Sequence, residues 1–202
     1  MIYRLFKTFF GSFIVALGIV VLLHAGLGAD PLSVFLLGIM EQTGPFLGYH
    51  TFGTLSTTYG IVILLIVYFI DKTKIGIGSI INSLTVGIFI NLLYSINADK
   101  WMINSDIFNI ITGPIIIGIG LVIYLSANLG AGSTEAIMVI IDERSRISLK
   151  VIRILQDAIF VIVGLLLQAP FGWGIVTGVL LIGPTIEYTI KFKDRLKKEI
   201  SK

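Results

Sequence analysis

The chain has no cysteine among its 202 residues and only two histidines, His24 and His50. The lack of cysteine excludes disulfide bonds, cysteine nucleophiles and thiolate-bound metals. The two histidines do not have the spacing of a metal-binding pair, and no HExxH motif is present, so the sequence predicts no metal and no cofactor. No pair of a nucleophile and a base recurs at helical spacing, which argues against an enzyme.

Charged residues are scarce as well. They make up 13% of the chain, whereas hydrophobic residues make up 55%, and the mean hydropathy is +0.97. This leaves too little polar surface to cover a soluble domain of this size, so the sequence predicts an integral membrane protein surrounded by lipid. Nucleic acid is not an expected partner, because the basic patch near the C-terminus is short and directly follows an apolar segment.

Six apolar segments have about the twenty residues that a helix needs to cross the hydrocarbon. They cover residues 10–28, 51–70, 76–97, 107–129, 149–168 and 173–192. Two further apolar segments, at about 31–41 and 133–143, are only half as long, so we expect half-helices or re-entrant segments there. The predicted fold is an all-α membrane protein with six transmembrane helices.

An internal repeat runs through the chain. Leu27-Gly28-Ala29 recurs 102 positions later as Leu129-Gly130-Ala131, and toward the end of each half the offset falls to 96, where Gly87 pairs with Gly183. Such matching indicates two diverged copies of one unit. The predicted units are a first repeat at 1–97, a second repeat at 107–192, each with one of the short segments, and a basic cytoplasmic tail at 193–202.

The basic residues predict the orientation, because Lys and Arg near span ends favour the cytoplasmic side. With the N-terminus inside, only Lys100 falls outside. The residues placed inside are Arg4, Lys7, Lys72, Lys74, Arg144, Arg146, Lys150, Arg153 and the six basic residues from Lys191 to Lys202. Six crossings then put both termini in the cytoplasm and make the two halves an inverted 3+3 repeat.

An alternative has eight crossings, with both short segments spanning the bilayer. The two repeats would then be parallel, and the loops at 42–50 and 71–75 would lie on opposite faces of the membrane. This alternative requires two spans that are too short for the hydrocarbon.

The two short segments have the features of helix starts. Asp30-Pro31 combines an N-cap with a proline at the first helical position, and Ser133-Thr134-Glu135 is predicted to supply a hydroxyl N-cap and a first-turn carboxylate. The unpaired N–H groups at each start carry partial positive charge. In an inverted repeat these two starts should approach each other near mid-depth, as the broken helices of many secondary transporters do.

We therefore predict a substrate site between Asp30 and Glu135, since an ionisable group in hydrocarbon costs roughly 2.5–3.5 kcal/mol. Glycines without a Cβ would let the backbone approach a ligand, and two nearby polar residues complete the predicted set of Gly28, Gly130, Gly132, Asn128 and His24. The two carboxylates favour a cationic or zwitterionic solute. The alternative is purely structural: the glycines permit turns and close packing, the carboxylates cap helices, and the polar side chains join helices.

Arg153 and Asp157 are spaced i, i+4 in the fifth segment and should neutralise each other on one helix face. The pair is interpreted either as a structural ion pair or as a gate that opens when the two side chains separate.

Several motifs together resemble the YczE/YyaS/YitT family of small bacterial integral membrane proteins. They are Leu27-Gly28-Ala29-Asp30-Pro31, Leu129-Gly130-Ala131-Gly132 leading to Met138, Gly76 to Asn82, Gly172-Trp173-Gly174 and Gly183-Pro184. Leu32 stands where the family usually has Trp, and Ser133-Thr134-Glu135-Ala136 replaces its Pro-Arg-Asp-Gly. The resemblance implies a multi-pass protein of the bacterial plasma membrane.

From these features we expect a transporter of a small polar solute that uses no cofactor. The alternative is a substrate-binding membrane subunit or accessory protein that acts with a partner. A homo-oligomer is compatible with either function.

Overall fold

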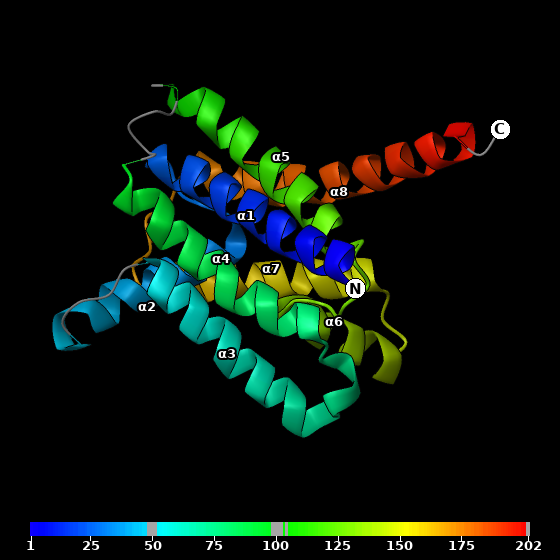
Figure 1. Ribbon diagram of the computed structural model, residues 1–202. Helices are drawn as coiled ribbons and strands as arrows, with labels where there is room; N and C mark the ends of the chain where they lie inside the picture. The colour runs from blue at the N-terminus through cyan, green and yellow to red at the C-terminus, as the bar shows by residue number, and fades with distance from the viewer. Residues whose placement is uncertain (48–51, 98–102, 104, 201–202) are drawn as a thin grey trace.

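The protein is all-α, as the hydropathy pattern predicts (Figure 1). The computed structural model describes residues 1–47, 52–97, 103 and 105–200, so Lys100 lies outside the described residues. Within that part of the chain there are eight α-helices and one 3-10 turn. They are α1 (Ile2–His24), α2 (Pro31–Leu47), α3 (Phe52–Asp71), η1 (Lys72–Lys74), α4 (Ile77–Ser95), α5 (Asp106–Leu125), α6 (Ser133–Arg144), α7 (Leu149–Leu166) and α8 (Trp173–Ile200).

Five of the described helices are long and apolar enough to cross a membrane: α1, α3, α4, α5 and α8. The helix α7 is 18 residues long and lies where the sequence predicts a sixth span, but it contains Lys150, Arg153 and Asp157. Large apolar side chains on the surface are strongly exposed, as expected of a lipid-facing surface; Phe69 of α3 is 84% exposed and Leu166 of α7 is 78% exposed.

The helix boundaries differ from the sequence prediction mainly at the membrane surfaces. The helix α2 has 17 residues and continues past the predicted end at residue 41, and α8 continues through most of the predicted tail. Backbone hydrogen bonding can extend a helix beyond the apolar segment, because polar side chains are well solvated outside the hydrocarbon. Gln42, in the added part of α2, is exposed and donates a 3.1 Å hydrogen bond to the carbonyl of Leu167.

The antiparallel pair α1 and α5 forms the most extensive helix interface in the described chain. Glycines bring their backbones into contact: Gly11 lies against Gly120 and Tyr124, and Gly18 lies against Gly113. A Cβ at position 18 would be only 2.8 Å from the Gly113 carbonyl oxygen. Small residues at this spacing allow the close van der Waals packing that joins helices within lipid.

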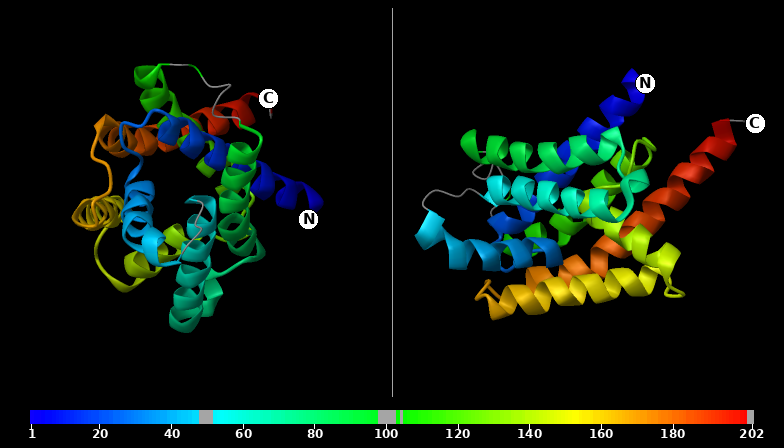
Figure 2. Two further views of the ribbon diagram at one scale, coloured as in Figure 1. Left: turned by 90° about the vertical axis from the view of Figure 1, so that its left-hand side faces the viewer. Right: turned by 90° about the horizontal axis from the view of Figure 1, so that it is seen from below.

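Figures 1 and 2 show how the other helices pack on this pair and on one another. The helix α4 packs on α1 and on α3, while α8 packs on α5; α2 packs on α7, and α3 packs on α6. The short helices run toward opposite ends of the bundle: α2 ends on the left of Figure 1 and α6 on the right. Both chain termini lie at the end toward which α6 runs.

Candidate functional site at the two helix breaks

The first break joins α1 to α2 through a glycine-containing segment. Gly26 and Gly28 adopt left-handed backbone conformations, with φ of 65° and 87°, which glycine adopts without steric cost. Gly28 is buried against Gly172, and the amide of Gly174 donates a 2.7 Å hydrogen bond to the Leu27 carbonyl. The start of α8 therefore holds the first break in place.

The second break joins α5 to α6 and has closely similar backbone geometry. Asn128 and Gly130 are left-handed, with φ of 50° and 117°. The amide of Gly78, at the start of α4, donates a 2.7 Å hydrogen bond to the carbonyl of Leu129. Asn128 is exposed, and its backbone carbonyl accepts a hydrogen bond from the Arg4 guanidinium.

Asp30 is only 9% exposed and caps the start of α2. Its Oδ2 accepts a hydrogen bond from the Ser33 amide at 3.3 Å, and its Oδ1 accepts one from the Ser33 hydroxyl at 2.5 Å. The predicted N-cap is thus confirmed. Gly178 of α8 lies directly behind it, since a Cβ there would be 3.0 Å from the Asp30 Cα.

The start of α6 differs from the prediction. Its N-cap is Gly132 and has no side-chain capping bond, so the predicted hydroxyl cap from Ser133 is wrong; Ser133 is already the first helical residue. Glu135 does lie in the first turn, as predicted. A Cβ at Gly132 would collide with Oε2 of Glu135, and it would be 2.8 Å from the Tyr124 hydroxyl, so only glycine fits here.

Tyr124 is the main residue at this break that the sequence analysis missed. It is 1% exposed, and its hydroxyl accepts a 3.1 Å hydrogen bond from the Gly132 amide. Asn82 of α4 also faces Gly132 and donates a 2.9 Å hydrogen bond to the hydroxyl of Ser12 on α1. A tyrosine within the apolar segment 107–129 was the available signal, since a buried phenol usually has a hydrogen-bond partner.

Arg153 and Asp157 form an ion pair on α7, with Nε and Oδ2 3.8 Å apart and side chains 31% and 22% exposed. Arg153 lines the α7–α8 cavity together with Gly178, which lies against Asp30. The charge of Arg153 is therefore close to the first break.

An aromatic cluster connects the helices around the breaks. The ring of Phe35 on α2 lies 5.4 Å from that of Phe160 on α7 and 6.0 Å from that of Tyr59 on α3, measured between centroids. Tyr59 is also close to Thr134 and within electrostatic reach of Glu135. The start of α6 therefore adjoins Tyr59, one of the three rings, and α2 supplies another.

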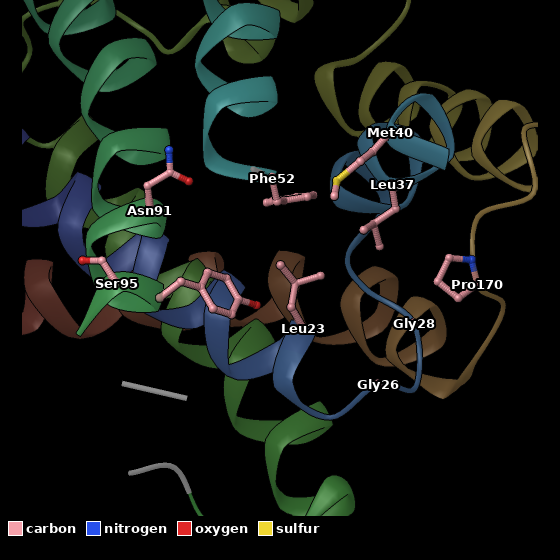
Figure 3. A pocket seen from close by; sticks show the side chains of 10 residues that line it. Leu23, Gly26, Gly28, Leu37, Met40, Phe52, Asn91, Ser95 and Pro170 are labelled. Carbon is pink, nitrogen blue, oxygen red and sulfur yellow. The ribbon is translucent and has the colours of Figure 1, made fainter. Parts of the chain in front are cut away.

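Two cavities flank the first break. The break cavity, about 620 Å³, lies on the α1 side (Figure 3) and is lined by Leu23, Gly26, Gly28, Leu37, Met40, Phe52, Asn91, Tyr94, Ser95 and Pro170. His24, the last residue of α1, is half-buried and directly follows Leu23, which lines this cavity. The α7–α8 cavity, about 990 Å³, lies between those two helices, and its lining includes Lys150, Arg153, Asp157, Gly178 and Glu187.

Comparison with known proteins places the chain among sequences without an assigned activity. A model of a family of unknown function, DUF6198, matches residues 2–191. An uncharacterised protein of Haemophilus influenzae is 28% identical over 179 residues, which cover 89% of this chain and 78% of the relative. From Bacillus subtilis, the uncharacterised protein YyaS is 24% identical over 92% of this chain and 91% of its own length. The uncharacterised membrane protein YczE is 24% identical over 90% and 83%. No solved structure matches.

Proposed function

The chain belongs to the DUF6198 family of unknown function and is a distant homologue of YyaS and the membrane protein YczE, and from this premise we propose that it is a transporter of a small polar solute. The proposed site is formed by the starts of α2 and α6. The protein would act in the bacterial plasma membrane as a multi-pass protein with both termini in the cytoplasm.

We propose that six helices span the bilayer as an inverted 3+3 repeat, with α7 as the sixth span and α2 and α6 as half-helices. Matched backbone geometry supports the repeat. The left-handed residues Gly26 and Gly28 correspond to Asn128 and Gly130 at the offset of 102 positions. The hydrogen bonds from Gly78 to Leu129 and from Gly174 to Leu27 are equivalent and of equal length.

Two contacts favour six crossings over eight. Lys74, after α3, forms an ion pair with Glu143 at the end of α6, and Arg144 donates a 3.2 Å hydrogen bond to the Ile70 carbonyl. The ends of α3 and α6 therefore lie at the same end of the bundle. Six crossings require this arrangement, whereas eight crossings would put these two ends on opposite faces. The positive-inside rule assigns that end to the cytoplasm.

The observation that carries the transport proposal is the position of the first break between the two cavities. Gly28 lines the break cavity, and Asp30, two residues later, backs onto Gly178, which lines the α7–α8 cavity. A small movement of this hydrogen-bonded segment would join the two spaces. Broken helices at such a position form the substrate sites of many secondary transporters.

The charges at the breaks favour a cationic or zwitterionic solute. Asp30 and Glu135 supply two carboxylates, and Arg153 lines the α7–α8 cavity together with Gly178, which backs onto Asp30. An ammonium group could pair with a carboxylate, and the acidic group of a zwitterion could pair with the guanidinium. Gly28 lines the break cavity and presents backbone there without a Cβ.

Uptake by proteoliposomes that contain only this chain tests the proposal. The probes are radiolabelled choline, putrescine and glycine betaine. We expect flux of at least one probe, and we expect Asp30→Asn and Glu135→Gln to abolish it while leaving folded protein in the membrane. Binding without flux would favour the alternative of a substrate-binding subunit that needs a partner. Flux from both variants equal to that of the wild-type protein would contradict the proposed site.

A further inference from the structure

The helices that correspond to α7 and α8 in the first half of the molecule are α3 and α4, and their described residues are closely packed. There, Gly53 of α3 lies against Gly87 of α4. A Cβ on Gly60 of α3 would be only 2.9 Å from the Cβ of Ser83 on α4. In the second half, a Cβ at Gly183 would meet no atom within 4 Å. Gly183 is the residue that corresponds to Gly87 at the offset of 96 positions.

One side chain accompanies this difference. A Cβ at Gly87 of α4 would collide with the small side chain of Thr57 on α3. The residue 96 positions after Thr57 is Arg153, whose much longer side chain lines the α7–α8 cavity.

The cavity has apolar walls that open toward lipid. Ile154 and Ile162 of α7 line it and are 56% and 58% exposed, and Leu180 of α8 lines it and is 62% exposed. Its volume of about 990 Å³ is within the range of sites for small-molecule ligands. An apolar chain is the kind of group that would fill these walls from the membrane.

Four charged residues line the cavity, two of them acidic and two basic. Each of the two basic side chains has N–H donors that no described acceptor binds. Glu187 is occupied by Lys191, whose Nζ lies 2.5 Å from Oε1. Arg153 has the 3.8 Å ion pair with Asp157 but, among described residues, donates no hydrogen bond. Lys150 likewise has neither a hydrogen bond nor an ion pair within the described chain, although its ammonium group acts electrostatically on Glu187. N–H groups of both side chains can therefore still donate to an anion.

We propose that the α7–α8 cavity binds a single-chain anionic amphiphile, whose apolar chain lies between the two helices and whose carboxylate or phosphate group binds Arg153 and Lys150. A guanidinium suits both anions because its planar N–H groups match their oxygen atoms in pairs. This binding site shares the α7–α8 cavity and Arg153 with the proposed transport path, but binding of an amphiphile is measured without flux, so either proposal can fail without the other.

Binding of radiolabelled palmitate to the full chain in phosphatidylcholine nanodiscs tests the proposal. We expect saturable binding of palmitate, with hexadecanol, its uncharged analogue, unable to displace it. We expect Arg153→Gln to weaken palmitate binding about ten- to hundredfold, because it removes a charge-assisted hydrogen bond. Displacement by hexadecanol as effective as that by unlabelled palmitate would overturn the role of the head group.

A second variant keeps the test independent of the ion pair. Gly183→Leu should fill the cavity without a clash and abolish palmitate binding. The matched control is Gly44→Leu in α2, because Gly44 also has open space around its Cβ position but lies outside the cavity. Binding by Gly183→Leu equal to that by Gly44→Leu would overturn the site. Full displacement of palmitate by phosphatidylglycerol in the nanodisc would overturn the single-chain assignment in favour of a membrane phospholipid.

Discussion

Gly178, in the second turn of α8, lies against the backbone of Asp30, so that the end of the first break is in direct contact with the beginning of the last helix. We predict that Gly178→Leu lowers the free energy of unfolding by about 1–3 kcal/mol, the usual cost of overpacking. Gly44→Leu, which introduces the same side chain where a Cβ meets no atom, should have little effect. Thermal unfolding in one detergent compares the two variants, and equal unfolding temperatures would contradict the contact.

The membrane topology can be measured directly, because the chain has no cysteine of its own. We predict that cysteines introduced as Thr73→Cys and Ser148→Cys react with a membrane-impermeant maleimide from the same side of the membrane. A third variant, Gly44→Cys, should react from the opposite side. Labelling of positions 44 and 148 from the same side would support eight crossings instead of six.

The cap at Asp30 can be separated from any role of its charge. We predict that Asp30→Ala destabilises the protein by about 1 kcal/mol, because the Ser33 amide loses its acceptor. Asp30→Asn keeps an acceptor oxygen and should unfold close to the wild-type temperature. If Asp30→Asn retains stability but loses flux, the carboxylate has a function beyond capping. If it retains both, Asp30 is only a cap.

Tyr124→Phe tests the polar contacts of the second break. Removing the hydroxyl leaves the buried Gly132 amide without its acceptor, and an unsatisfied buried donor costs about 1–3 kcal/mol. We therefore expect a lower unfolding temperature at nearly unchanged packing volume. Tyr3→Phe is a suitable control, because Tyr3 is exposed at the start of α1. A Tyr124→Phe protein as stable as this control would show that the hydroxyl is dispensable.

The positions of the helices could be predicted from the sequence, because the length of an apolar segment reports its fit to the bilayer. The α3 helix, Phe52–Asp71, lies within one residue of the predicted segment 51–70. The breaks could also be predicted, since a glycine-containing segment before Asp30-Pro31 combines left-handed backbone with a helix N-cap. The ends of α2 and α8 could not be predicted from hydropathy, because a helix can continue into water.

The contacts within the candidate site were less accessible to sequence reasoning. Ser133 is a good N-cap residue, but the helix begins at Ser133 itself and Gly132 is the N-cap. The Gly132 amide instead donates its hydrogen bond to the Tyr124 hydroxyl, a partner eight residues away that local sequence patterns do not indicate. Similarly, the repeat suggests equal packing in both halves. Only the contacts in the structure show that Gly53 and Gly60 pack on α4, whereas Arg153 and Asp157 line a cavity between α7 and α8.

Arg4, in the first turn of α1, donates a 2.6 Å hydrogen bond from Nε to the carbonyl of Ala127, just past the end of α5. A ribosome releases α1 well before it has synthesised α5. During that interval the glycine face of α1 has no partner helix, and Arg4 has no carbonyl of the second half to bind. The early helices can therefore reach their final packing only after α5 has been synthesised.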